Sequence, residues 1–283
     1  MKQFDPEKVL EEKAAVETFY EKKAVLGIDI YGYSQYDIGP QSFIPVLFDL
    51  LYRKTVADCL EREGSFFSNY ANLESLKKNF IPTGDGGFQI IETPFHAILF
   101  ISIFKTNLKL YHNKVPIPKS EYKILPKLRD QIGEIELRFC ITFDNIMHFD
   151  DNYFGPAIIN CARILSKDSL NRFLIDQATV SWFEQELGGI ENLSMLKLIT
   201  LAEVNYFKTF KLTDKSKSYF FQEGEIGFRT INLLKIGKIK SKNTELMVYN
   251  LHVQLRVNTP LNDKNIKHYI ITIGNLNTTG IQQ

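Results

Sequence analysis

The sequence contains little that would mark a secreted, membrane-spanning or zinc-binding protein. Its three cysteines, Cys59, Cys140 and Cys161, are far apart and lack CxxC spacing, which argues against a zinc site and a disulfide framework. No apolar run approaches the length needed to cross a bilayer, and the charged N-terminal stretch has no signal-peptide core. We therefore expect buried free thiols and a cytoplasmic protein without membrane contact.

An excess of charge of one sign is also missing. Lys and Arg number 34 against 33 Asp and Glu, so the formal net charge is +1 and no global field favours a polyanion. The basic stretch 235–242 is more typical of a solvated hairpin edge than of a nucleic-acid contact, so a nucleic-acid partner is not expected. Five histidines without ligand or triad spacing are expected to be packed or exposed: His96, His112, His148, His252 and His268.

The chain is long enough for more than one domain. At 283 residues and 44% hydrophobic content it has ample material for a large core. Asp5 and Pro6 are typical of a helix start, which predicts an N-terminal helix over 1–23. Gly188-Gly189 suggests a boundary, so we predict a main domain over 24–190 and a small β-rich, sensor-like module over 191–283.

Hydrophobic periodicity predicts an α+β fold. The expected order is strand, helix, hairpin, helix, strand, which gives a ferredoxin-like βαββαβ sheet with helices on one face. In the helix over 43–64, apolar residues recur at helical spacing and predict a core-facing side, namely Phe43, Val46, Leu47, Leu50 and Leu51. The predicted segments are a strand ending near 30, a hairpin over 80–91, a helix over 94–111, a strand over 134–143, a polar loop over 148–156, a helix over 157–166, a strand over 173–175, a helical stretch over 180–210, and strands over 228–239, 245–257 and 267–273.

Two acids occupy unusual places in this pattern. Asp29 ends the apolar stretch LGID, where burial of a carboxylate is unfavourable unless a cation pairs with it. Asp85 lies in the glycine-rich reversal TGDGG of the predicted hairpin. Carboxylates on two adjacent strand ends can share a divalent metal. The ordinary alternative is a strand-end residue and a turn residue with no shared role.

Three motifs in order resemble the class III nucleotidyl cyclases. DIYGYS resembles the family's D-I-x-G-F/Y-S/T, TGDGGF its G-D hairpin, and YFGPAIINCARIL its G-x-x-V-N-x-A-x-R-L helix. The resemblance covers about residues 24 to 178. It implies a cyclase catalytic domain in which a ribose 3′-hydroxyl attacks the α-phosphate of a nucleoside triphosphate and releases pyrophosphate. Such a reaction depends chiefly on positioning and charge neutralisation.

The resemblance also implies roles for individual residues. It places two Mn²⁺ or Mg²⁺ ions on Asp29, Asp85 and the carbonyl of Ile30, and a homodimer in which Arg163 and an asparagine come from the partner chain. Here Asn160 lies three positions before Arg163 instead of four, and Ile159 takes the expected place. The backbone expected to contact the phosphates belongs to Tyr31, Gly32, Tyr33 and Ser34.

The positions that read the base differ from those of adenylate cyclases. Ile81 and Asn152 stand where adenylate cyclases carry a lysine and an aspartate. This departure resembles the bacterial pyrimidine cyclases of Pycsar antiphage systems, and it implies UTP, or else CTP, as substrate and a cyclic UMP or cyclic CMP signal. Two alternatives stay open: an adenylate or guanylate cyclase with a divergent pocket, and a silent cyclase fold that binds nucleotides or senses phage.

Overall fold

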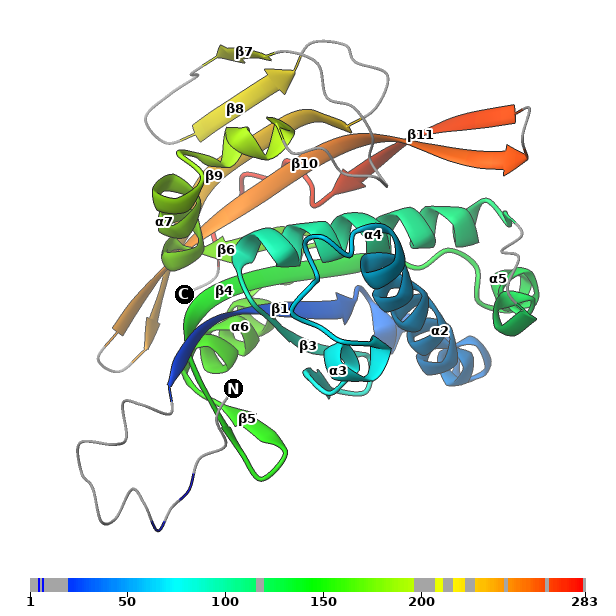
Figure 1. Ribbon diagram of the computed structural model, residues 1–283, viewed down its shortest axis with the longest axis horizontal. Coiled ribbons are helices and arrows are strands. Elements are labelled where there is room, and N and C mark those ends of the chain that lie inside the picture. The colour runs from blue at the N-terminus through cyan, green and yellow to red at the C-terminus, as the bar shows by residue number, and fades with distance from the viewer. Residues whose placement is uncertain are drawn as a thin grey trace.

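One curled sheet organises the computed structural model of the chain (Figure 1), which describes residues 5, 7, 20–115, 120–195, 207–210, 216–221, 227–241, 244–262 and 265–281. Its strand order is β2-β3-β1-β4-β6-β10-β9-β8-β7, with β5 paired to β4 and β11 to β10. The strands are β1 Glu21–Ile30, β2 Phe80–Pro82, β3 Gly86–Ile91, β4 Leu137–Phe149, β5 Asn152–Phe154, β6 Phe173–Asp176, β7 Phe207–Phe210, β8 Ser216–Phe221, β9 Gly227–Ser241, β10 Thr244–Asn262 and β11 Asn265–Ile273.

The first half of the chain confirms the predicted α+β class and its βαββαβ order. The elements β1, α2, β2, β3, α4 and β4 follow one another along the chain, and their strands lie in the order β2-β3-β1-β4. The hairpin β2–β3 is antiparallel, as the glycine-rich turn predicts. The helices are α2 Ile38–Arg62, α3 Leu73–Lys77, α4 Pro94–His112, α5 Leu125–Ile132, α6 Pro156–Lys167 and α7 Gln177–Glu186, with 3₁₀ turns at Tyr33–Gln35, Ser120–Tyr122 and Ile190–Met195.

Helices cover both faces of the sheet, so the prediction of helices on one face is wrong. Leu26 and Ile28 of β1 belong to the large core formed with α2 and α4, whereas Val25 belongs to a second core formed with α6. This follows from the alternation of side chains along a strand. A Cβ on Gly27 would lie 2.6 Å from Leu165, so the glycine allows α6 to pack closely on the second face.

The C-terminal strands continue the same sheet. β10 pairs antiparallel with β6, and Ile231 and Val253 join the large core. The β-rich character predicted for this region is therefore observed, while a domain boundary at residue 190 stays a prediction. The helical stretch predicted over 180–210 is wrong at its end, because α7 ends at Glu186, residues 196–206 lie outside the described part and 207–210 form β7.

The structure bears on two other predicted segments, the N-terminal helix and the loop over 148–156. The helix predicted over 1–23 lies almost wholly outside the described residues, and its last three positions belong to β1. The predicted polar loop over 148–156 is wrong, because β4 continues to Phe149 and turns into β5. Asp150 and Asp151, with φ of 49° and 55°, make the two-residue turn. Short polar side chains tolerate this left-handed conformation better than bulky ones do.

The predicted helix over 43–64 is observed as part of α2, but its buried side differs in part from the predicted one. In α2, Leu47 and Leu51 are buried, as the spacing predicts, and Ile44 is buried with them. Phe43 and Val46 are 44% and 48% exposed, contrary to the predicted core face. All three cysteines are buried free thiols, as expected. Among the described helices, none is both long and apolar enough to span a membrane.

Asp176 links the sheet to α7 and predicts a pH dependence of stability. Its carboxylate accepts a hydrogen bond from the Thr179 N–H at 2.8 Å, but burial raises its pKa from 3.8 to about 6. The folded protein thus retains a proton that the unfolded chain loses, so stability falls as the pH rises from about 4 to about 6.

Asp176→Asn keeps the capping oxygen and removes the titration. We expect the free energy of unfolding of this variant, relative to wild type, to be higher at pH 7 than at pH 4 by on the order of 1–3 kcal/mol. Urea unfolding of both proteins at the two pH values measures this difference. A difference between the proteins that does not change with pH would contradict the assignment.

Candidate functional site

The two acids singled out in the sequence meet at the end of β1. Asp29 lies opposite Gly86 of β3 and opposite Arg138 of β4. The Ile30 N–H donates to the Asp85 carbonyl at 3.1 Å, which ties the hairpin turn to the strand end. The Asp85 carboxyl is near enough to Asp29 to raise the pKa of the Asp29 carboxyl. The structure therefore brings together both carboxylates, in line with the sequence-based expectation.

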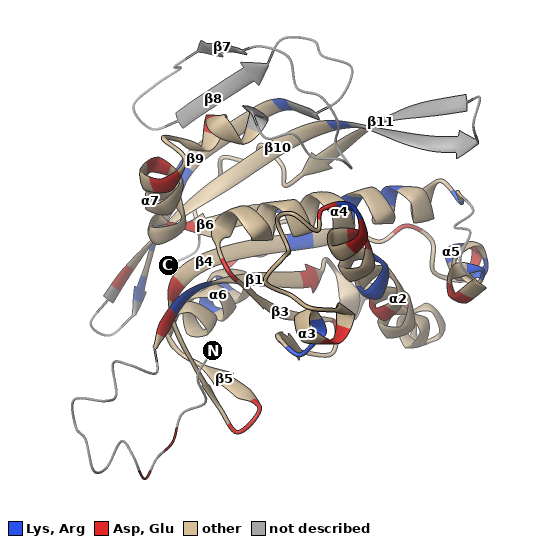
Figure 2. Ribbon diagram, viewed as in Figure 1, with Lys and Arg blue, Asp and Glu red and all other residues tan. Residues whose placement is uncertain are grey.

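Arg138 is the cation that pairs with Asp29. Its Nε donates to an Asp29 carboxylate oxygen, and its Nη1 donates to the backbone carbonyl of Asp168 at the end of α6. The ion pair is partly buried, with side chains 21% and 17% exposed. Figure 2 shows acidic colour at the arrowhead of β1 and basic colour on the neighbouring part of β4.

Three influences act on the pKa of the Asp29 carboxyl, two in one direction and one in the other. Burial raises this pKa, the charge and hydrogen bond of Arg138 lower it, and neighbouring Asp85 raises it further. The net direction is upward, because the effect of burial, with that of Asp85, outweighs the effect of Arg138. Sequence reasoning missed Arg138. Its signal was a cation in the middle of the predicted strand over 134–143, where a buried partner is expected.

Glycine makes the close approach of the hairpin possible. A Cβ on Gly86 would lie 2.0 Å from the Ile28 carbonyl oxygen, a distance that no side chain tolerates. Gly84 adopts φ of 100°, which L residues rarely adopt. The turn that carries Asp85 is therefore held against β1 by backbone contacts, and its sequence cannot be varied freely.

The predicted phosphate loop follows β1 directly. Gly32 has φ of 70° and precedes a short 3₁₀ turn that begins at Tyr33. The Tyr31 N–H donates to the Glu136 carbonyl at 2.9 Å, so this amide is already used. Among the described residues, none accepts a hydrogen bond from the N–H groups of Gly32, Tyr33 or Ser34. Three of the four predicted amides are thus available to an anion.

The predicted residues of α6 lie on the same sheet face as Asp29, but they do not contact the acids. Asn160 and Arg163 are half-buried on one flank of the helix, and Ile159 is 49% exposed. Within the described part of the chain, no hydrogen bond or ion pair joins Asn160 or Arg163 to Asp29 or Asp85.

The two predicted base-reading residues lie on neighbouring hairpins. Ile81 of β2 packs against the second core, whereas Asn152 of β5 is exposed. The Tyr153 hydroxyl donates to Asn79 Oδ1 at 2.5 Å and thereby joins the β4–β5 hairpin to the segment before β2. Neither residue carries the charge that would read a purine in adenylate cyclases.

The donor chemistry of the acid pair suits a hard divalent cation. Two neighbouring carboxylates supply the oxygen ligands that Mg²⁺ and Mn²⁺ prefer. Within the described residues there is no cluster of three or more His, Cys, Asp or Glu side chains able to hold a metal. The two carboxylates can be completed by backbone carbonyl, water or phosphate oxygens, which are also ligands of Mg²⁺.

Comparison with known proteins finds similarity to solved structures but no match to a protein-family model or to a curated protein. Among solved structures, the chain is similar to the guanylyl cyclase Cya2, with 10% identity, 82% of this chain and 92% of that chain covered, and a TM-score of 0.43. It is also similar to an adenylate/guanylate cyclase/hydrolase from Silicibacter pomeroyi, with 14% identity, coverage of 82% and 96%, and a TM-score of 0.40. Adenylate cyclases from Trypanosoma brucei in their monomeric state give 9% identity, coverage of 88% and 94%, and a TM-score of 0.42.

Proposed function

We propose that this protein is a metal-dependent nucleotide cyclase that converts UTP, or else CTP, to the 3′,5′-cyclic monophosphate and pyrophosphate. The observation that supports it most is the contact between Asp29 and Asp85 beside a glycine turn with free backbone amides. Together these groups offer ligands for a cation and donors for phosphate oxygens at one strand end. The order of the three sequence motifs supports the same reaction class.

Asp29, Asp85 and the Ile30 carbonyl would hold the divalent ions, Mn²⁺ or Mg²⁺. When bound, such ions neutralise the triphosphate and lower the pKa of the attacking hydroxyl. Arg138 then competes with the metal for Asp29, because its guanidinium already contacts that carboxylate. Its second contact, with the Asp168 carbonyl, allows Arg138 to remain anchored while Asp29 changes partner.

The remaining groups would act on the phosphates. The free N–H groups of Gly32, Tyr33 and Ser34 point to an anion site at the entrance of α2. Arg163, with Asn160, would neutralise charge that develops in the transition state. Because neither contacts the acids of its own chain, the proposal requires that they be supplied by a partner in a homodimer.

Exposed apolar side chains support such a dimer. Phe154 and Ile159 are 46% and 49% exposed beside the start of α6, and Ile38 and Phe43 are 86% and 44% exposed on α2. Exposed apolar groups gathered on two surfaces are typical of an interface. A head-to-tail pair of copies would cover both surfaces and form two composite sites.

The pyrimidine preference rests on Ile81 and Asn152. An apolar side chain and a neutral amide suit a base read through carbonyl and ring contacts better than one read by charge. In this proposal the product is a cyclic pyrimidine signal in bacterial antiphage defence, made in the cytoplasm and passed to a separate effector. The C-terminal strands would then serve the sensor-like role.

Incubation of the purified chain with each of ATP, GTP, CTP and UTP and with Mn²⁺ tests this proposal. We expect cyclic UMP as the main product, with cyclic CMP formed less, and chromatography with mass spectrometry to identify both. A clear purine preference would replace the pyrimidine assignment by the adenylate or guanylate alternative.

A second candidate function is a catalytically silent fold that binds or senses nucleotides. The ion pair between Arg138 and Asp29 favours it, because an internal cation can replace the metal permanently. The shifted position of Asn160 favours it as well. Nucleotide binding without any turnover, in Mg²⁺ and in Mn²⁺, would support this candidate over the cyclase.

A further inference from the structure

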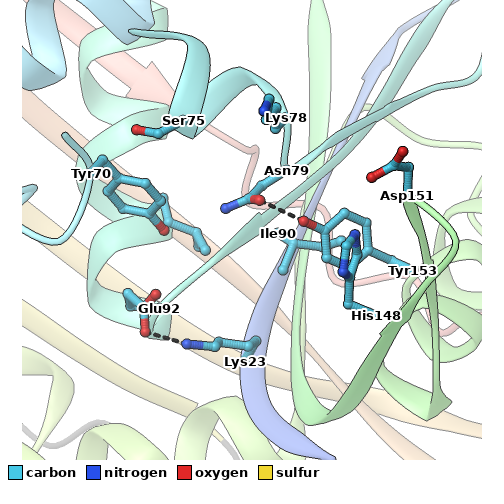
Figure 3. Close-up of a pocket in the computed structure, with 11 residues that line it drawn as sticks. Lys23, Tyr70, Ser75, Lys78, Asn79, Ile90, Glu92, His148, Asp151 and Tyr153 are labelled. Atoms are coloured by element: carbon cyan, nitrogen blue, oxygen red, sulfur yellow. Dashed lines mark hydrogen bonds and ion pairs between the residues drawn. The ribbon is translucent and has the colours of Figure 1, made fainter. Parts of the chain in front are cut away.

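Pockets border the sheet at more than one place. The pocket drawn in Figure 3 is lined by Tyr153, which follows Asn152 in β5, so it adjoins the proposed base-reading residues. A different pocket, with a volume of about 450 Å³, lies between the second half of α4 and the end of β11 (Figure 1). None of its lining residues belongs to the acid pair, the predicted phosphate loop or the base-reading positions. Its size is that of a small-molecule site.

Two lysines of α4 line this pocket without a counter-charge in contact. Lys105 and Lys109 are both partly buried, and at four positions apart they lie on the same side of the helix. Neither ammonium group forms a hydrogen bond or an ion pair with a residue that the structure describes. Burial lowers the pKa of the Lys105 amine, the charge of Glu136 partly opposes this, and Lys109 lowers the pKa further. Two such like charges are unfavourable together, so an anion between them would be stabilising.

The other titratable groups of the lining do not neutralise both lysines. Burial lowers the pKa of His112 to about 4, so this ring is uncharged at neutral pH. Glu134 pairs with Arg129 at 2.8 Å, whereas Glu136 is exposed and accepts a hydrogen bond from the Asn171 amide. Two lysines against one exposed acid leave an excess of one positive charge. This excess suits a ligand with a single negative charge.

An open strand edge forms another wall. Ile270, Ile271 and Thr272 all line the pocket, although successive side chains of a strand point to opposite faces. The pocket therefore borders the edge of β11 and not one of its faces. Among the strands that the structure describes, β11 pairs with β10 alone, so its second edge carries unpaired backbone N–H groups. Such groups are good donors to carboxylate oxygens.

Apolar side chains complete the lining. Leu108, Ile135 and Ile271 border the pocket and are 1%, 0% and 3% exposed. The side-chain amide of Asn275 donates to the Asn171 carbonyl, which joins the segment after β11 to the loop before β6. A ligand here would thus touch α4, the approach to β4 and the C-terminal strands at once. Its body would gain from contact with apolar groups, which an inorganic ion cannot make.

We propose that this pocket binds a small organic monocarboxylate, whose charged group contacts Lys105 and Lys109 while its body packs against the apolar lining. A phosphate monoester carries a charge of about −1.5 to −2 at pH 7, which exceeds the positive excess and would be repelled by Glu136. A neutral molecule would leave the two lysines without an anion. The inference goes beyond the proposed function, because the ligand is not a nucleotide and its binding does not depend on turnover.

Isothermal titration of the full chain at pH 7 with butyrate, benzoate, benzamide and phenyl phosphate tests the assignment. We expect saturable binding of a monocarboxylate, best for benzoate, and at least about tenfold weaker binding of benzamide, which has a similar shape without the charge. Phenyl phosphate should also bind at least about tenfold more weakly than benzoate. No saturable binding of either carboxylate, or equal binding of benzamide or phenyl phosphate, would overturn the proposal.

Variants of the two lysines locate the site. Lys105→Met and Lys109→Met should each weaken benzoate binding by about tenfold, because each removes one positive charge from the pocket. The matched control Lys127→Met, at an exposed position of α5 outside the lining, should leave the affinity unchanged. If both pocket variants bound benzoate as tightly as this control, the carboxylate would lie elsewhere and the proposal would be wrong.

The melting temperature of the ligand-free chain gives an independent measurement. Lys105→Met should raise it, because an apolar side chain replaces a partly buried ammonium without a counter-charge. A lowered melting temperature would show that the amine already has a partner and would overturn the proposal. Benzoate should stabilise wild type and should have little effect on the variant. Because these measurements need no nucleotide, an inactive protein that binds benzoate would contradict the proposed function and not this inference.

Discussion

Asp29→Asn and Asp85→Asn should each reduce cyclic nucleotide formation by at least about a hundredfold, since each removes a carboxylate charge that a divalent ion needs. The fold should survive, because asparagine at position 29 keeps an acceptor oxygen for Arg138, and the contact of Asp85 with Ile30 is made by its backbone carbonyl. In wild type, Mn²⁺ at about a hundred times its dissociation constant should raise the melting temperature by roughly 5 to 10 °C. Both variants should lose this metal-dependent stabilisation.

The melting experiment matters because it does not depend on turnover. Asp130→Asn is a matched control, since Asp130 lies on α5 in an exposed ion pair with Lys114. That control should keep both activity and metal-dependent stabilisation. If the Asp29 variant kept its metal-dependent stabilisation, the acid pair would not be the metal site. If wild type showed metal-dependent stabilisation but no turnover, the silent nucleotide-binding candidate would be favoured.

Asp168→Ala should lower the free energy of unfolding by about 3–5 kcal/mol, because it leaves a buried guanidinium without its counter-charge. Asp168 and Arg172 form an ion pair at 2.6 Å with side chains 3% and 1% exposed. Arg172 also donates to the Thr279 carbonyl at 2.5 Å, so the pair attaches the C-terminal segment to the end of α6. Chemical denaturation measures the loss.

Two further variants test whether the loss comes from the unpaired guanidinium of Arg172. Asp130→Ala, at the exposed pair, should cost less than about 1 kcal/mol. The double variant Asp168→Leu/Arg172→Met should recover much of the loss, because apolar groups of similar volume need no counter-charge. A loss from Asp168→Ala no larger than that from Asp130→Ala would show that Arg172 is not dependent on this carboxylate.

Local patterns were sufficient for most elements near the acid pair. The apolar stretch before Asp29, the glycine-rich hairpin and the helix from Pro94 follow from periodicity, turn chemistry and a proline at the helix start. Phe43 and Val46 show where such patterns fail. Their helical spacing is correct, but which side of α2 faces the sheet depends on contacts with α4 that spacing cannot specify.

The position of α6 shows the same limit at the level of the whole sheet. Ala157, Cys161 and Ile164 predict an apolar helix face, but no local feature states which side of the sheet that face covers. The C-terminal strands were predicted as strands, yet the pairing of β10 with β6 joins residues 72 to 76 positions apart, as in the pairs Val248–Asp176 and Asn250–Leu174. Pairing over such separations is decided by the fit of the assembled core.

The sequence by itself determined that Asp29 ends an apolar strand and needs a positive partner, because a buried carboxylate without one is unfavourable. It also determined that Asp85 lies in a glycine turn. Only the tertiary structure decided that the partner within the chain is Arg138 and that the two acids touch, since both facts depend on the register of β1 with β3 and β4.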